Sequence, residues 1–290
     1  MTTAAEWVQG ARPRTLGAAV SPVLVGTAAA YADADTLTWW RAGAALVVAL
    51  GLQVGVNYAN DYSDGVRGTD TKRAGPLRLT ATGVAAPAAV RNAAAIAFGV
   101  AAVFGLALAI AVDLRLLLVG AVAIAAAVLY TGGPRPYGYS GLGELAVLVF
   151  FGFVATAGSA YVQADRVPAA AWWGAVAMGL LACAILLANN IRDIDGDRSV
   201  GKRTLPVHVG APAARALYAG CVAGAFLAVV AVGVLFPTAL VALAALPLAV
   251  GPVRLVATRR DPPSLVAALV GTARLELVVA VLLSVGLVTS

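Results

Sequence analysis

The stretch NYANDYSDGVRGTD, residues 57–70, sets the architecture expected of this chain, because it puts carboxylates at the end of a long apolar run. A second stretch of the same kind, NNIRDIDGDRSVGKRTL at residues 189–205, ends another apolar run. Only 12% of the chain is charged, yet these two stretches hold six of its fourteen acidic residues, which makes a chance distribution a poor explanation. The six are Asp61, Asp64, Asp70, Asp193, Asp195 and Asp197.

The composition around these stretches indicates a membrane protein. Mean hydropathy is +0.90 over 290 residues, whereas about a quarter of the residues of a soluble domain are charged. Nine stretches approach or reach the roughly 20 apolar residues that a bilayer-crossing helix needs. They are 15–33, 42–61, 92–112, 114–130, 142–163, 169–192, 213–235, 238–256 and 265–288. We expect one all-helical domain over residues 1–290 with nine transmembrane helices, eight or ten being the alternatives.

The basic residues are distributed unevenly over the two sides of such a bundle. With the N-terminus in the cytoplasm, only Arg41, Arg115 and Arg166 fall on the outer side. The positive-inside rule therefore favours a multi-pass protein of the cell membrane with both acidic stretches on the cytoplasmic face of the lipid bilayer. The formal charge of +6 reports this topology, and we expect no nucleic-acid partner.

The sequence gives little support for a disulfide, a histidine metal site or a Ser/His/Asp triad. Cys183 and Cys221 both lie inside apolar runs, where packing is expected and a disulfide is not. The single histidine, His208, lies in a polar loop, so neither a histidine metal site nor a Ser/His/Asp triad can be built from this chain.

The spacing of the aspartates points to a divalent cation. An aspartate at the centre of a membrane helix costs on the order of 3 kcal/mol, so these side chains must lie at helix ends or line a polar cavity. If the helices continue through both stretches, Asp61 and Asp64 share one helix face, as do Asp193 and Asp197. A bound cation would remove the repulsion within each pair, and Mg²⁺ prefers such hard oxygen ligands. For Asp70 and Asp195, metal binding and a solvated loop remain equal alternatives.

Basic residues beside the aspartates indicate a phosphate ligand. A diphosphate can be held by Mg²⁺ on one side and by guanidinium or ammonium groups on the other. Topology alone also predicts bases here, so each one taken singly has two explanations. The candidates for binding diphosphate are Arg67, Lys72, Arg73, Arg78, Lys202 and Arg203.

The two stretches are also related to each other. Asn60 and Asp64, shifted by 129 residues, fall on Asn189 and Asp193. Each copy ends an apolar run and is followed by a basic pair. This pattern suggests an internal duplication, with halves near 57–78 and 189–205.

At these residues the chain resembles the UbiA superfamily of intramembrane aromatic prenyltransferases. The family's first motif, N-D-x-x-D-x-x-x-D, matches NDYSD at residues 60–64, and its second, D-x-x-x-D, matches DIDGD at 193–197. One position departs, because the last aspartate of the first motif falls on Gly68. The resemblance implies nine helices around a central cavity. It also implies Mg²⁺ as cofactor, with Asn60, Asp61, Asp64, Asp193 and Asp197 as metal-site residues.

Further stretches resemble the branch of that family that prenylates 1,4-dihydroxy-2-naphthoate for menaquinone. They are ARPRTL at 11–16, GPLRLT at 75–80 and YTGGPRPYGYSGLGE at 130–144. The resemblance implies transfer of a polyprenyl group from its diphosphate to the naphthoate, with loss of CO₂ and diphosphate, giving demethylmenaquinone. Family members with other aromatic acceptors, 4-hydroxybenzoate or homogentisate, are the alternative.

The implied reaction passes through an allylic cation, which aromatic side chains can stabilise. The candidates are Tyr62, Tyr130, Tyr137, Tyr139, Phe150 and Phe151, although tyrosines are also common at membrane interfaces. We expect Tyr130 to act with Asp64 and Asp193 as the catalytic set. Tyr137, Tyr139 and Arg135 are the candidates for binding the acceptor, Arg135 through the acceptor's carboxylate. In the ninth run, Arg274 and Glu276 have functional and anchoring explanations of equal weight.

Two rivals belong to other classes. A transporter also places carboxylates in a membrane cavity, but near the midplane rather than beside dense basic loops. A phosphatidyltransferase that acts on CDP-linked alcohols would carry a D-G-x-x-A-R motif. DGVRGTD at 64–70 begins in the same way but lacks the Ala-Arg pair, and the second acidic stretch would stay unexplained.

Overall fold

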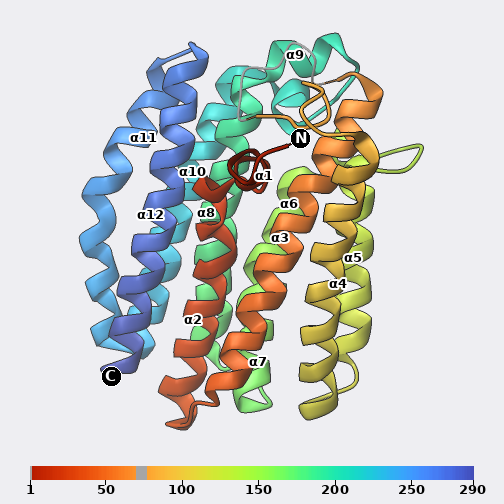
Figure 1. The fold of residues 1–290 in the computed structure, drawn as a ribbon. Coiled ribbons are helices and arrows are strands. Elements are labelled where there is room, and N and C mark those ends of the chain that lie inside the picture. The colour runs from red at the N-terminus through yellow and green to blue at the C-terminus, as the bar shows by residue number, and fades with distance from the viewer. Residues whose placement is uncertain (1, 70–76) are drawn as a thin grey trace.

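Helices make up every regular element in the part of the chain that the structure describes. The computed structural model describes residues 2–69 and 77–290 (Figure 1). The main helices are α2 (Gly17–Ala34), α3 (Trp39–Arg67), α4 (Pro87–Ala111), α5 (Leu116–Thr131), α8 (Ala169–Arg192), α10 (Leu205–Leu235), α11 (Leu246–Thr258) and α12 (Pro262–Val288). The shorter elements are α1 (Ala4–Gly10), η1 (Pro13–Thr15), η2 (Tyr137–Tyr139), α6 (Gly143–Val147), η3 (Leu148–Ala157), α7 (Gly158–Ala164), α9 (Ile194–Ser199) and η4 (Pro237–Ala245).

The all-helical membrane architecture is confirmed, whereas the count of nine spans is not. Within the described ranges, seven helices are long and apolar enough to cross a membrane. An eighth is obtained if the N-terminal helices, bent by 51° at their junction, form one span. The remaining predicted span, 114–130, is α5, which is apolar but has only 16 residues. All nine predicted stretches are helical. They differ in whether each helix is long and straight enough to cross a membrane by itself.

Local sequence signals explain where several helices begin and end. Pro87 and Pro262 occupy first-turn positions, where a missing N–H leaves no hydrogen bond unmade. Gly68 ends α3 in the left-handed conformation, with φ 75°. Glycine adopts this conformation without the steric penalty of a Cβ atom. At position 68, where the family motif has an aspartate, this chain therefore has the residue that most readily ends a helix in this way.

Helix α8 is the central element of the bundle. Its most apolar window is 72% buried, against 22–44% for the corresponding windows of the other long spans. It packs against α2, α10, α12 and η3. The approach to η3 is close, because a Cβ on Gly152 would lie 2.8 Å from the Cα of Gly179. The second acidic stretch thus follows the best-anchored helix of the molecule.

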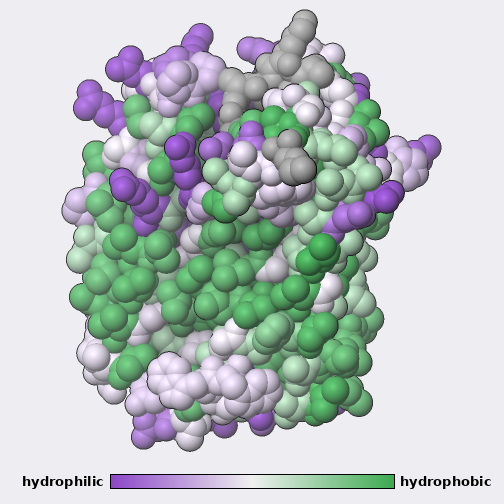
Figure 2. Space-filling view, viewed as in Figure 1, coloured by the Kyte–Doolittle hydropathy of each residue, from purple (hydrophilic) through white to green (hydrophobic). Residues whose placement is uncertain are grey.

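The outer surface is divided along the bundle axis. Figure 2 shows a broad apolar belt with hydrophilic residues gathered at the two ends. Helices α3 and α8 begin with exposed tryptophans and end at the acidic stretches, so these aromatic residues lie at the other end of the bundle. They are Trp39, Trp40, Trp172 and Trp173. Tryptophan is enriched at membrane–water interfaces, so this end has the composition of an interface.

Candidate active site

A large cavity opens inside the helical bundle. It has a volume of about 1290 Å³ and is lined by residues of α2, α3, α5, η3, α8 and α12. Most of its wall is apolar, including Val48, Leu52, Phe150, Phe151 and Leu186. Polar residues line it where α3 and α8 end, among them Asn60, Asp64, Arg78, Asn189, Asn190, Arg192 and Lys202. The two acidic stretches therefore contribute to one shared cavity.

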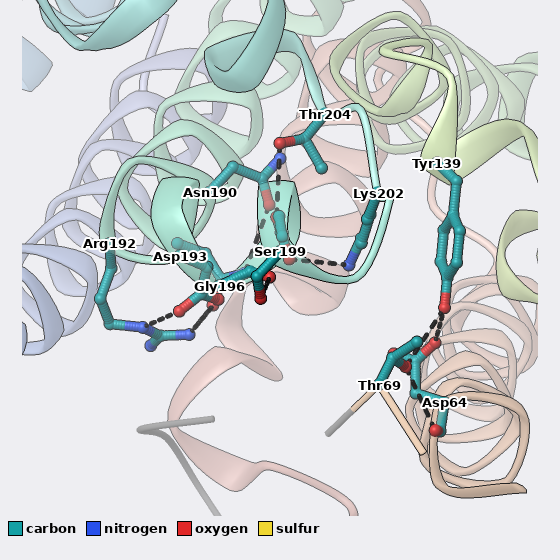
Figure 3. Close-up of polar contacts among 12 residues, drawn as sticks. Asp64, Thr69, Tyr139, Asn190, Arg192, Asp193, Gly196, Ser199, Lys202 and Thr204 are labelled. Atoms are coloured by element: carbon teal, nitrogen blue, oxygen red, sulfur yellow. Dashed lines mark hydrogen bonds and ion pairs between the residues drawn. The ribbon is translucent and has the colours of Figure 1, made fainter. Parts of the chain in front are cut away.

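Asp64 is the carboxylate of the first stretch that lines this cavity. It is buried in the last turns of α3 and accepts a hydrogen bond of 2.6 Å from the Tyr139 hydroxyl. One turn earlier, the side-chain Oδ1 of Asn60 accepts a hydrogen bond of 2.7 Å from the Thr131 hydroxyl. Both side chains are thus held by residues at the end of α5 or in the segment that follows it. Figure 3 shows the contact between Asp64 and Tyr139.

Asp61 is engaged elsewhere. Its two carboxylate oxygens accept the backbone N–H groups of Leu79 and Thr80, at 2.8 and 2.9 Å. Its side chain is buried and holds the chain at residues 79–80 against α3. The predicted role of Asp61 in the metal site stays a prediction, and in this arrangement both of its oxygens already serve the fold.

The second stretch does not continue α8 as a straight helix. Asp193 has φ −98° and ψ 4°, and α9 begins directly after it. The N–H of Asp197 still donates to the carbonyl of Asp193 at 2.8 Å, so the two aspartates remain one turn apart. Arg192 binds both oxygens of Asp193, at 2.7 Å each. Asp197 accepts from the Thr204 hydroxyl at 3.3 Å and pairs with Lys202 at 3.8 Å.

The predicted diphosphate-binding residues separate into three groups. Arg78 and Lys202 are buried and line the cavity. Arg67 and Arg203 are exposed. The Arg67 guanidinium donates to the carbonyls of Thr131 and Gly133, which ties α3 to the loop after α5. Lys72 and Arg73 lie outside the described residues, as does Asp70.

Tyr139 connects the two acidic stretches. Besides binding Asp64, its ring lies 5.2 Å from the Lys202 Nζ, and its carbonyl accepts the Arg203 N–H at 2.9 Å. Figure 3 shows Lys202 between Tyr139 and Asp193. Burial, together with the neighbouring Asp64 carboxylate, raises the pKa of Tyr139 to about 12. The hydroxyl therefore stays protonated near neutral pH and is able to donate to Asp64.

The predicted aromatic and acceptor-binding residues are only partly brought together. Tyr130, Tyr137, Phe150 and Phe151 line the cavity, whereas Tyr62 and Tyr139 are not among its lining residues. Tyr130 and Tyr137 meet edge to face, with ring centroids 5.4 Å apart. The Tyr137 hydroxyl donates to the Ala126 carbonyl at 2.8 Å. Arg135 is exposed and does not line the cavity, and Asp195 is exposed as well.

Several polar residues at the cavity were missed by sequence reasoning. Arg12 lines it and has a left-handed backbone, φ 58°, which is uncommon outside glycine. The amide of Asn57 donates to the Ala11 carbonyl at 2.9 Å, which fixes this segment to α3. In the sequence, the only sign that this segment reaches the site was the pair of arginines on either side of a proline in ARPRTL. Asn190 was missed because the predicted repeat aligns Asn189, and not Asn190, with Asn60.

The residues present fit a magnesium ion that also binds phosphate. No group of three or more His, Cys, Asp or Glu residues in the described ranges is placed to hold a metal by itself. Mg²⁺ usually binds through one or two carboxylates, with substrate phosphates and water completing its shell. The buried Asp64 lines the cavity and can supply one carboxylate, with Arg78 and Lys202 to balance phosphate charge. Asp193 and Asp197 are not among the lining residues, but they contact Arg192 and Lys202, which are.

Comparison with known proteins gives a consistent result. The model of the UbiA prenyltransferase family matches residues 19–286. The 1,4-dihydroxy-2-naphthoate octaprenyltransferase of Mycobacterium tuberculosis is 49% identical over 257 residues, which are 88% of each chain. The protein of the same name from Escherichia coli is 41% identical, over 73% of this chain and 71% of the relative.

Solved structures show the same fold at low sequence identity. A UbiA homologue from Archaeoglobus fulgidus, bound to GPP and Mg²⁺, matches with a TM-score of 0.67 at 14% identity. The match covers 96% of this chain and 99% of that one. An apo UbiA homologue from Aeropyrum pernix K1 matches with a TM-score of 0.66 at 18% identity, over 93% and 97%.

Proposed function

This chain belongs to the UbiA prenyltransferase family, and from that premise we propose that it transfers a polyprenyl group from polyprenyl diphosphate to 1,4-dihydroxy-2-naphthoate. The observation that carries the proposal is one apolar cavity of about 1290 Å³ whose polar end receives residues of both acidic stretches. A prenyl chain suits the apolar wall, and its diphosphate suits the polar end. The names of the relatives at 41–49% identity support the naphthoate as acceptor.

The polar end supplies groups of both signs for the diphosphate. Asp64 and the second stretch would hold Mg²⁺, which supplies Lewis-acid stabilisation of the charge on the leaving diphosphate. Lys202 and Arg78 line the same end and stabilise that charge directly. The GPP and Mg²⁺ bound by the Archaeoglobus fulgidus homologue support this donor site.

The proposed reaction breaks one C–O bond and one C–C bond and forms one C–C bond, beside aromatic side chains of the cavity wall. The C–O bond of the prenyl diphosphate breaks, and its electron pair leaves with the diphosphate. The ring carbon that bears the carboxylate then forms the new C–C bond, and loss of CO₂ restores aromaticity, giving demethylmenaquinol, the reduced form of demethylmenaquinone. Tyr130 offers a π face to the allylic cation. The apolar wall around Phe150 and Phe151 excludes water, which would otherwise capture that cation.

We also propose the orientation in the membrane. The end that carries the acidic stretches, with its arginines and lysines, would face the cytoplasm, and the end with the exposed tryptophans would lie at the outer interface of the cell membrane. Water-soluble naphthoate and diphosphate headgroups would then reach the polar end from the cytoplasm.

An acceptor screen tests the function. Purified protein in liposomes is given one prenyl diphosphate, Mg²⁺, and 1,4-dihydroxy-2-naphthoate, 4-hydroxybenzoate or homogentisate. We expect prenylation of the naphthoate with one CO₂ released per product, and a loss of orders of magnitude in Asp64→Asn. Preference for either of the other two acceptors would overturn the acceptor assignment. Unchanged turnover of Asp64→Asn would overturn the site.

A further inference from the structure

Glu144 is a buried carboxyl group that the proposed reaction does not use. It lies in the first turn of α6 and is only 8% exposed. Burying a carboxyl group in an apolar bundle is unfavourable unless the protein supplies partners. Its Oε1 accepts a hydrogen bond of 3.0 Å from Nδ2 of Asn190, which is itself buried on α8 and lines the cavity. The carboxyl group is therefore joined to the polar end of the cavity.

From Asn190 a series of side-chain hydrogen bonds leads to the second acidic stretch. The Asn190 Oδ1 faces the Asn189 amide, which donates to it at 3.5 Å. The Asn189 Oδ1 accepts from Arg192 Nη2 at 2.9 Å. Arg192 then binds both oxygens of Asp193. Five side chains, from α6, α8 and the residue that follows α8, thus form one connected network.

The backbone explains why this network needs an anchor. The regular helix ends at Arg192, so the α8 backbone alone does not hold the Asp193 side chain in place. Since Oε1 of Glu144 accepts, it keeps the Asn190 amide nitrogen toward α6 and the amide oxygen toward Asn189. If the Asn190 amide rotated, its nitrogen would face the donating Asn189 amide, and the contact would be lost.

We propose that Glu144 is a positioning residue that acts through Asn190 to hold Arg192 and Asp193 in the geometry needed to bind Mg²⁺ and diphosphate. The inference rests on the proposed function, because it assigns Glu144 to the same site. Hydrogen-bond partners of metal ligands commonly change metal affinity or activity by about 10–100-fold when they are removed. Glu144 lies three hydrogen bonds further out than Arg192, the direct partner of Asp193, so we expect the lower end of that range.

A neighbouring contact supplies a matched control. The Cys183 thiol donates to the backbone carbonyl of Glu144 at 3.1 Å, and this contact does not involve the Glu144 side chain. Cys183→Ala therefore disturbs the same contact between α6 and α8 and leaves the network of side chains intact. Glu144→Leu removes the acceptor oxygen, and Glu144→Gln retains one.

The test measures thermal protection of the detergent-solubilised protein by Mg²⁺ with geranyl diphosphate, alongside turnover. For Glu144→Leu we expect the Mg²⁺ concentration for half-maximal protection to rise about tenfold. Glu144→Gln should stay within about threefold of wild type because it keeps the acceptor, and Cys183→Ala should match wild type. A wild-type Mg²⁺ response in Glu144→Leu, or equal shifts in all three variants, overturns the proposal.

A double-mutant cycle separates positioning from packing. If Glu144 acts through Asn190, then Glu144→Leu adds nothing to the Mg²⁺ shift already caused by Asn190→Leu. Additive shifts overturn the proposal. Protection of the wild type without naphthoate transfer would overturn only the acceptor assignment, whereas no Mg²⁺-dependent protection would overturn both proposals.

Discussion

Removing one hydroxyl group, in Tyr139→Phe, tests how Asp64 is held. The Tyr139 hydroxyl donates to buried Asp64 at 2.6 Å, while the ring separately contacts Lys202 and Arg67. Phenylalanine keeps the ring and removes the hydroxyl, which also contacts the Thr69 hydroxyl at 3.4 Å. Hydrogen bonds to charged groups contribute about 1.5–3 kcal/mol. At about 1.4 kcal/mol per factor of ten, the Mg²⁺ concentration for half-maximal activity should rise by up to about ten- to hundredfold.

The matched control is Tyr137→Phe. Its hydroxyl donates to a neutral acceptor, the Ala126 carbonyl, at 2.8 Å, and its ring packs against Tyr130. Its loss should cost about 0.5–1.5 kcal/mol of stability and leave the Mg²⁺ requirement unchanged. The assay is a Mg²⁺ titration of prenyl transfer, with melting temperature measured in parallel. If Tyr139→Phe needs no more Mg²⁺ than Tyr137→Phe, the argument that this hydroxyl orients Asp64 is refuted.

Five further substitutions, which make three predictions, separate catalysis from folding. Asp193→Asn should lower turnover by orders of magnitude, while Asp195→Asn, at an exposed position, should leave turnover near wild type; equal losses in a turnover assay would contradict the site. Asp61→Ala should lower the melting temperature, because the buried Leu79 N–H and the partly buried Thr80 N–H both lose their acceptor. Leaving a buried donor unpaired costs about 1–3 kcal/mol, and an unchanged melting temperature would count against this role. Gly26→Ala should destabilise by about 1–3 kcal/mol, since a Cβ there would lie 2.1 Å from a backbone carbonyl oxygen. Gly99→Ala, which has open space, should be neutral or stabilising in the same thermal assay.

Membrane location and the positions of the helices follow from the sequence alone. The apolar runs are long, and in a bilayer their backbone groups can be satisfied only within a helix or a closed barrel. The run predicted at 169–192 is α8, Ala169–Arg192, without a shift at either end. The number of complete spans did not follow, because it depends on the bend between the N-terminal helices and on the short α5.

The roles of individual aspartates were decided only by tertiary structure. Asp61 and Asp64 are three residues apart, which the sequence reads as one helix face, yet about 100° per residue leaves them roughly 60° apart around the axis. That angle is enough for Asp64 to line the cavity while Asp61 binds the backbone at Leu79 and Thr80. Sequence spacing determines the direction in which a side chain leaves its helix. Whether that side chain then meets the cavity or a loop depends on how distant segments of the chain pack. For the same reason, only the tertiary structure shows that Lys202 is buried and Arg203 exposed.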